Sequence, residues 1–231
     1  MLQHATKRTS GVTDFGGDEF GAAESRVGMS GVYARHGKRV FDVVLCLAAA
    51  PFVAPLVGVL SVAVCLDGGP AFYGQRRLGR GGRAFICWKL RTMVCDADER
   101  LELHLAADPR ARAEWEATQK LRNDPRVTRF GRFLRASSLD ELPQLWNILK
   151  GEMSVVGPRP FTPDQSELYH GRSYYRLRPG LTGYWQVGER NGASFAQRAV
   201  DDARYAREMS FRTDLRTILK TVRVVLRGTG C

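Results

Sequence analysis

The sequence has few of the residues that build metal centres and no Walker-type phosphate loop. The four histidines show no ligand spacing, and the five cysteines are scattered, odd in number and without a C-x-x-C pair. This pattern argues against zinc sites and disulfide frameworks and predicts free thiols in a reducing compartment. The short glycine runs are weak signals of phosphate binding on their own.

Negative charge is also scarce. The chain has 35 Lys and Arg against 24 Asp and Glu, a formal net charge of +11. Such an excess predicts an anionic partner, and nucleic acid, anionic lipid and phosphorylated small molecules all satisfy it. Apolar residues make up 44% of the chain, as in ordinary globular proteins, which excludes wholesale disorder.

One long apolar run stands out in this basic chain. Residues 1–36 before it are polar and glycine-rich, which predicts a disordered tail without the layout of a signal peptide. From residue 40 to 66 only Asp42 and Ser61 are strongly polar, and about 20 apolar residues suffice for a helix to span a bilayer. A buried core helix is the alternative, but the length of the run favours membrane insertion.

Two features favour a re-entrant hairpin over a straight span. Pro51 and Pro55 fall inside the run, and an interior proline costs a helix about 3 kcal/mol. Basic residues flank the run on both sides, which favours the cytoplasmic side for both ends. We therefore predict a helical element over residues 37–67 that enters the membrane, breaks near Pro55 and returns.

Residues 68–231 have the patterns of a mostly helical α+β domain. A glycine-rich turn separates two extended runs within residues 70–93. A helical pattern covers residues 96–121, and Pro109 interrupts it. The last helical pattern carries an apolar face that can pack on the core, lie on a membrane or meet another subunit: Leu215, Ile218, Leu219, Val222 and Val225.

Arginines recur at every third position in DPRVTRFGRFLRASS, interleaved with Phe130, Phe133 and Leu134. The four arginines are Arg126, Arg129, Arg132 and Arg135. On a helix they form a basic stripe beside an apolar one, a surface that can lie at a membrane interface. A solvated arginine face on an ordinary helix is the alternative.

The segment SSLDELPQLWN, residues 137–147, places Asp140 and Glu141 side by side. One interpretation is structural. Ser138 and Glu141 match the S-x-x-E capping box, and acidic residues suit the positive end of a helix dipole. The leucines and Trp146 that follow would then form the buried face of the helix.

The other interpretation of this segment is chemical. A helix N-terminus would keep Asp140 ionised, as a nucleophile or a metal ligand requires. Arg135 lies five residues upstream and can hold an anion, and Mg²⁺ can bridge a carboxylate and substrate phosphates. Downstream, Pro158 and Pro160 stiffen the chain around Arg159. These features suit the transfer of a phosphorylated group close to a membrane.

Four segments carry a resemblance to a known family. In chain order they are KRVFDVVL, GQRRLGRGGRAFICWKLRTM, DPRVTRFGRFLRASSLDELPQLWNILKGEMSVVGPRP and RPGLTGYWQVGERN. Over about residues 38–227 the chain resembles the bacterial sugar transferases, which are monotopic polyprenyl-phosphate phosphoglycosyl transferases. The exopolysaccharide-initiating type is the most similar, and the D-E-L-P-Q run together with G-P-R-P is the most specific part of the match.

The resemblance implies transfer of a sugar-1-phosphate, often of galactose or glucose, from a UDP-sugar to undecaprenyl phosphate with release of UMP. Asp140 matches the aspartate that attacks the β-phosphate and forms a phosphosugar-aspartyl intermediate. The same residue would bind Mg²⁺, with Mn²⁺ as the alternative metal. Glu141 would act as a base or an orienting group.

The resemblance also suggests phosphate-binding residues. Arg135 matches the phosphate-binding arginine of the family, and Arg159 would hold the active-site loop or a phosphate. Lys89 and Arg91 are further candidates, for which contact with lipid headgroups is the alternative.

The fold that the resemblance implies is α+β, predominantly helical and monotopic. Residues 1–36 would form the tail, residues 37–67 the re-entrant helix, and residues 68–231 the catalytic domain on the cytoplasmic face of the bacterial inner membrane. The expected partners are the UDP-sugar, undecaprenyl phosphate and membrane lipids. Nucleic acid is not expected as a partner, and a homodimer stays open.

Two other classes of protein fit parts of the sequence. A nucleic-acid-binding protein would explain the charge but not the apolar run, and no helix-turn-helix or zinc-finger pattern is present. A membrane scaffold without catalytic activity would explain the apolar run and the basic surface. It would not need Asp140, so full biological activity of an Asp140→Asn protein would support it.

Overall fold

The computed structural model describes residues 32–118, 121–188 and 195–226. The longest element is helix α2 (Lys38–Cys65), which continues directly from a π-helical turn, η1 (Tyr33–Gly37). The sequence assigned η1 to the disordered tail, so that boundary is corrected here, while residues 1–31 of the predicted tail lie outside the described residues.

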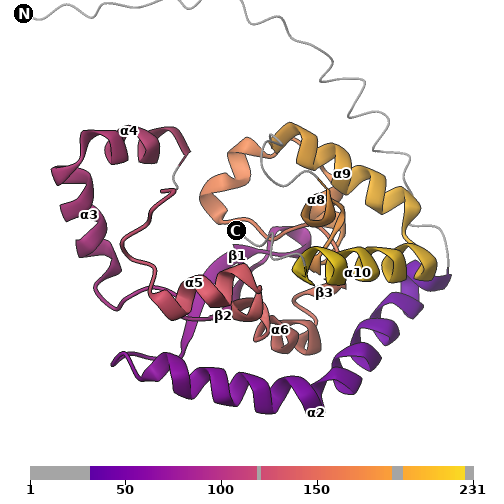
Figure 1. Ribbon diagram of the computed structural model, residues 1–231. Helices are drawn as coiled ribbons and strands as arrows, with labels where there is room; N and C mark the ends of the chain where they lie inside the picture. The colour runs from indigo at the N-terminus through magenta and orange to yellow at the C-terminus, as the bar shows by residue number, and fades with distance from the viewer. Residues whose placement is uncertain (1–31, 119–120, 189–194, 227–231) are drawn as a thin grey trace, which may run out of the picture.

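Helix α2 bends partway along its length and curves around one side of the protein (Figure 1). Pro51 and Pro55 both lie inside it, yet the helix is continuous from Lys38 to Cys65. The predicted break near Pro55 is therefore a bend, because a proline removes a single hydrogen bond and kinks a helix that its neighbouring turns continue. Among the described residues, α2 is the helix long and apolar enough to cross a membrane.

Both ends of α2 pack on the rest of the protein, and its middle is largely exposed. Asp42 and Cys46 near the start are buried, as are Leu60 and Val64 near the end. In the middle of the helix, Phe52 is 80% exposed. This distribution is that of a helix whose ends are anchored on the domain and whose central turns leave an apolar surface exposed.

A buried ionic cluster anchors the beginning of α2; we call Lys38, Asp42 and Asp214 the Lys38 cluster. The Lys38 Nζ lies 3.0 Å from Asp42 Oδ1 and 2.9 Å from Asp214 Oδ2. Ser154 donates a hydrogen bond to Asp42, and Tyr33 donates one to Asp214. The cluster thus joins α2 to segments more than 100 residues away in the chain.

Arginine side chains bind the two ends of α2 to the domain. Near the start, Arg39 donates hydrogen bonds to the carbonyls of Ile148 and Leu149, which end helix α6 (Gln144–Lys150). At the other end, Arg91 donates to the Val64 carbonyl at 3.1 Å. Each guanidinium thereby binds carbonyl groups in the last turn of a helix, where intrahelical partners run out.

After α2 the chain forms a two-stranded antiparallel hairpin. Strand β1 (Phe72–Leu78) pairs with β2 (Ala84–Leu90), with Phe72 opposite Leu90. The turn between them contains η2 (Arg80–Gly82), in which Gly81 and Gly82 adopt φ of 69° and 73°. These left-handed angles favour glycine, so the predicted glycine turn between two extended runs is confirmed.

Helices α3 (Ala97–Ala107) and α4 (Pro109–Thr118) form an arm beside the main body of the protein (Figure 1). Pro109 begins α4, where it has no intrahelical hydrogen bond to lose. The predicted interruption at Pro109 is thus confirmed.

The remaining elements complete a predominantly helical α+β fold, as predicted. Strands β3 (Ser154–Val156) and β4 (Gly180–Thr182) form a short parallel pair. The connection between them contains η4 (Pro163–Leu168) and α7 (Ser173–Arg176). Helices α8 (Tyr184–Val187), α9 (Phe195–Glu208) and α10 (Phe211–Leu226) follow.

Candidate active site

The Asp140–Glu141 pair lies in a short 3-10 turn, η3 (Leu139–Glu141), that follows helix α5 (Arg129–Ala136). Ser138 has a left-handed backbone, with φ 57° and ψ 18°, and its N–H donates to the Arg135 carbonyl at 3.1 Å. Ser138 therefore ends α5 instead of beginning the next helix.

Three structural predictions about this segment are wrong. The Ser138 side chain makes no capping hydrogen bond, so the expected Ser138–Glu141 capping box does not form. Helix α6 begins only at Gln144, so Asp140 does not lie in its first turn. Trp146 is also 60% exposed and not part of a buried face.

Lys89 of strand β2 makes the shortest ion pairs with the carboxylates of Asp140 and Glu141. Its Nζ lies 2.7 Å from Glu141 Oε1 and 3.6 Å from Asp140 Oδ2. Lys89 was a predicted phosphate-binding candidate, and the structure brings it together with the carboxylate pair. It can neutralise these carboxylates before substrate binds.

Asn147 of α6 sets the spacing between β2 and the carboxylate pair, and the sequence did not point to it. Its side-chain oxygen accepts a hydrogen bond from the Trp88 N–H at 3.1 Å, and its amide donates to the Ile86 carbonyl at 2.7 Å. Asn147 is fully buried. These two bonds tie α6 to the strand that carries Lys89, and the only sequence signal was an amide within an apolar helix.

The environment of Asp140 differs from the one predicted. Asp140 is buried, and burial raises the pKa of its carboxyl group. Lys89 and Arg135 lower this pKa, whereas the neighbouring Glu141 raises it. The prediction relied on a helix dipole to keep Asp140 ionised, but a three-residue turn has no comparable dipole. Lys89 and Arg135 instead oppose the effect of burial on this pKa.

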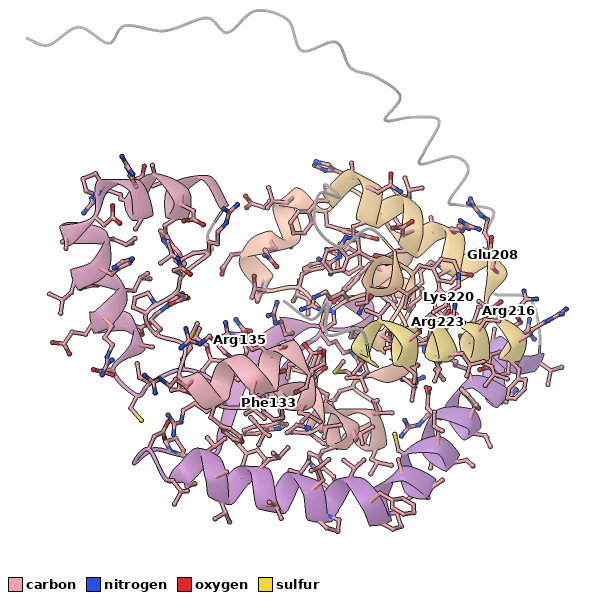
Figure 2. The ribbon with its side chains drawn as sticks, viewed as in Figure 1. Phe133, Arg135, Glu208, Arg216, Lys220 and Arg223 are labelled. Atoms are coloured by element: carbon pink, nitrogen blue, oxygen red, sulfur yellow. The ribbon has the colours of Figure 1, made fainter. Side chains whose placement is uncertain are left out.

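Arg135 projects from the end of α5 (Figure 2). Its Nε donates to the Thr92 hydroxyl at 2.9 Å, and its charge acts on Asp140. Gly131 allows α5 to lie directly on the segment after β2, since a Cβ at Gly131 would be 2.0 Å from the Thr92 carbonyl oxygen. This close packing holds α5, which carries Arg135, against the segment after β2.

The four arginines predicted to form one stripe separate in the structure. Arg126 precedes α5, is buried and pairs with Asp124 at 2.6 Å. Arg129 and Arg132 are exposed on α5, whereas Arg135 is half-buried. The helix begins too late to include Arg126, so a single basic face over all four residues does not form.

Arg159 reaches the carboxylate pair from the loop after β3. Its Nη2 lies 3.8 Å from Glu141 Oε1, and its guanidinium carbon lies 5.5 Å from the centre of the Trp185 ring. Gly157 lets this loop pack closely against the backbone of Arg178, since a Cβ at Gly157 would be 2.4 Å from the Arg178 carbonyl oxygen. Arg159 thus joins the group as predicted, and Trp185 is a neighbour that the sequence did not single out.

Arg91 does not join this group. Its guanidinium donates to the carbonyls of Val64, Pro70 and Met93 and forms an ion pair with Asp67. The structure thus gives Arg91 contacts that hold the end of α2 and places it apart from the carboxylate pair. Strand β2 ends at Leu90, so the alternation that carries Lys89 to the carboxylates stops before Arg91.

The carboxylate pair is suited to a hard cation. Within the described ranges no group of three or more His, Cys, Asp or Glu side chains is arranged around a common point. Asp140 and Glu141 nevertheless offer adjacent carboxylates, and Mg²⁺ is commonly bound by one or two carboxylates together with substrate phosphates. The donor set fits a Mg²⁺ that arrives with a phosphorylated substrate.

The site is thus a buried carboxylate surrounded by Lys89, Arg135 and Arg159 beside a long apolar helix. These features define a class of protein that handles anionic groups next to an apolar phase. A family model described as "Bacterial sugar transferase" matches residues 33–228. The chain belongs to the bacterial sugar transferase family.

Curated relatives support this assignment. The chain is 47% identical over 199 residues to the undecaprenyl-phosphate galactose phosphotransferase of Salmonella typhimurium, covering 85% of this chain and 42% of that protein. It is 47% identical over 196 residues to the exopolysaccharide production protein ExoY of Rhizobium meliloti, covering 84% and 87%. A UDP-glucose:undecaprenyl-phosphate glucose-1-phosphate transferase of Caulobacter vibrioides is 41% identical over 196 residues, covering 80% and 68%. The chain thus spans about two fifths of the Salmonella relative but most of ExoY.

Proposed function

We propose that the protein transfers a sugar-1-phosphate from a UDP-sugar to undecaprenyl phosphate and releases UMP. The observation that carries the proposal is that Asp140 is buried, lies 3.6 Å from Lys89 Nζ and has its pKa, which burial raises, lowered by the charge of Arg135. The names of the relatives support galactose-1-phosphate or glucose-1-phosphate as the transferred group. The reaction would be the first membrane step in the assembly of an exopolysaccharide or another surface glycan.

The first half of the reaction forms a covalent intermediate on Asp140. A carboxylate oxygen of Asp140 attacks the β-phosphorus of the UDP-sugar, and the bond from this phosphorus to the oxygen bridging the α- and β-phosphates breaks. UMP leaves with the bonding electrons, and the sugar phosphate stays on Asp140. Covalent catalysis of this kind splits one difficult transfer into two easier ones.

The second half regenerates the enzyme. An oxygen of undecaprenyl phosphate attacks the same phosphorus and displaces the Asp140 carboxylate. The product is a lipid-linked sugar diphosphate. Water must be excluded while the intermediate persists, and the burial of Asp140 supports this requirement.

The cations around Asp140 have separate tasks in this proposal. Arg135 and Arg159 bind phosphate oxygens, where the guanidinium geometry allows two parallel hydrogen bonds. Lys89 holds Glu141 and lowers the pKa of Asp140, and Glu141 orients the group or accepts a proton. A Mg²⁺ ion, or Mn²⁺ in its place, held by Asp140 and Glu141 would offset the pyrophosphate charge and improve UMP as a leaving group.

The position of α2 fits a reaction with a lipid. The central turns of α2 are exposed and apolar while both its ends contact the domain. We infer that this helix dips into the inner membrane from the cytoplasmic face, with its bend at the deepest point. Such a monotopic arrangement would bring the phosphate of undecaprenyl phosphate to the height of Asp140. A homodimer of the protein is compatible with this arrangement.

The test is UMP release from UDP-galactose and from UDP-glucose by the protein in nanodiscs containing undecaprenyl phosphate and Mg²⁺. Asp140→Asn should abolish release, whereas Asp98→Asn, on the exposed arm helix α3, should leave it unchanged. Without the lipid acceptor, the intact wild-type protein should gain the mass of one hexose phosphate. If neither sugar reacts, N-acetylated UDP-sugars are the next substrates. Equal UMP release by the Asp140→Asn protein would refute the proposal.

A further inference from the structure

Helix α10 carries an exposed apolar stripe that the proposed reaction does not use. The stripe consists of Phe211, Leu215, Leu219 and Val222, whose exposed fractions lie between 41% and 62%. Positions with this spacing fall on one face of a helix. Another side of α10 is covered: Asp214 and Thr217 are buried. The helix thus packs on the domain by one face and leaves a second apolar face open.

A basic stripe runs beside the apolar one. It consists of Arg212, Arg216, Lys220 and Arg223, all exposed. Three of them project from α10 in Figure 2. Each follows an apolar stripe position by one residue, so the two stripes lie about 100° apart around the helix. The acidic residue of α10, Asp214, is fully buried in the Lys38 cluster, so no carboxylate of this helix faces outward.

The apolar stripe begins next to the start of α2. The Phe211 ring lies 5.3 Å from the Phe41 ring and 6.3 Å from the Tyr33 ring, centre to centre. Val40 and Val44 of α2 are exposed close by in the sequence. In Figure 1, α10 begins beside the start of α2 and the two helices then diverge, and the ion pair of Lys38 with Asp214 confirms the contact at their starts. The exposed apolar surfaces of the two helices therefore adjoin at the aromatic group.

We infer that α10 lies in the membrane interface and binds anionic lipid. The apolar stripe enters the boundary between headgroups and acyl chains, about 5–10 Å deep, and the basic side chains reach back to lipid phosphates. This inference rests on the proposed insertion of α2 but not on the transfer reaction. It also accounts for the amphipathic last helix, for which the sequence left three options open.

Charge favours a lipid surface over a second copy of the chain on this face. In a symmetric dimer the same patch meets itself, so the outward charges that α10 brings to the contact would all be positive. The exposed surface of α10 offers no acidic side chain to pair with those of a second copy. An anionic leaflet supplies the opposite charge over the whole length of the stripe.

Fluorescence quenching by brominated lipids tests the location of α10. Cys65, Cys95 and Cys231 are first replaced by serine, and single cysteines are then introduced for labelling with bimane. Leu219→Cys reports on α10, Phe52→Cys on the middle of α2, and Val200→Cys on α9. Nanodiscs contain phosphatidylcholine and phosphatidylglycerol, with bromine either near the glycerol or near the chain ends.

The inference predicts that bimane at position 219 is quenched more by the shallow bromine than by the deep one, and that bimane at position 200 is quenched by neither. Quenching at 52 without quenching at 219 would overturn the inference while leaving the insertion of α2 intact. Absence of quenching at 52 would overturn the insertion itself. Disulfide cross-linking of two copies through position 219, with no quenching there, would assign the stripe to a dimer.

The role of charge is tested by neutralising the basic stripe. The triple variant Arg216→Gln, Lys220→Gln and Arg223→Gln should reduce quenching at position 219 at least roughly twofold in anionic nanodiscs, because each cation near an anionic surface contributes to attraction. The matched control removes the same charge elsewhere, through Arg110→Gln, Arg204→Gln and Arg207→Gln. Equal quenching in both variants, or equal wild-type quenching in pure phosphatidylcholine, would contradict recognition of anionic lipid.

Discussion

Removing Lys38 should destabilise the protein far more than removing an exposed lysine that has an equally short ion pair. Asp42 and Asp214 are both fully buried, and Lys38 lies within 3.0 Å of each. Lys38→Met would leave two buried carboxylates and no ammonium group between them. Breaking a buried ion pair in this way costs about 3–5 kcal/mol. In a domain of this size, each kcal/mol lowers Tm by about 2–4 °C, which gives a fall of roughly 6–20 °C.

The matched control for this variant is Lys150→Met. Lys150 pairs with Glu152 at 2.6 Å, but its side chain is 45% exposed. Exposed pairs contribute about 0–1 kcal/mol, so Tm should change little. Both variants can be followed by tryptophan fluorescence during heating in detergent. If the two substitutions lower Tm equally, or if Lys38→Met leaves Tm unchanged, the Lys38 cluster does not anchor α2 as described.

Three further predictions concern the carboxylate site. Burial raises the pKa of Asp140, and the charge of Lys89 lowers it. Lys89→Met should therefore raise this pKa further and move the acidic limb of the pH profile of UMP release to higher pH. An acidic limb that does not move would contradict the role assigned to Lys89. A carboxyl group whose pKa is raised in the folded state destabilises that state once pH rises above its pKa in the unfolded chain. Asp140→Asn removes this charge, so Tm at neutral pH should stay equal or rise. The same variant should abolish UMP release, because it removes the nucleophile. A fall in Tm would show that the charge is stabilising. Gly131→Ala would place a Cβ 2.0 Å from the Thr92 carbonyl oxygen, and the displacement should cost about 1–3 kcal/mol and raise KM for the UDP-sugar. Gly58→Ala, which meets nothing within 4 Å, is its control, and equal effects would refute the packing argument.

The parts of the fold that depend on local chemistry were predictable from the sequence. The turn with Gly81 and Gly82 needs left-handed backbone angles, and Pro109 needs a helix start, so both positions follow from the residue type alone. The Asp140–Glu141 pair was recognisable because the surrounding motif is specific. The structure brings it together with Lys89 and Arg159 from two other elements.

Features that depend on distant contacts were not predictable. Ser138 matches a capping pattern, yet it ends the preceding helix, because α5 packed on Thr92 decides where the chain turns. Arg91 lies only two residues after Lys89 in the chain. Its contacts are nevertheless set by the carbonyls of Val64 at the end of α2 and Pro70 beyond it. The pairing of Lys38 with Asp214 joins residues from opposite ends of the described chain, and no local periodicity reports such a contact.

The arginine bonds at the two ends of α2 have a mechanical consequence. A free transmembrane helix adapts to bilayer thickness by tilting or sliding. Arg39 binds the last carbonyls of α6 and Arg91 binds the Val64 carbonyl, so neither end of α2 can shift without breaking contacts to the domain. With α2 inserted as proposed, the lipids of a thicker or thinner membrane would have to deform around this helix. Hydrophobic mismatch would then be absorbed by the bilayer, and the height of the carboxylate pair above it would stay constant.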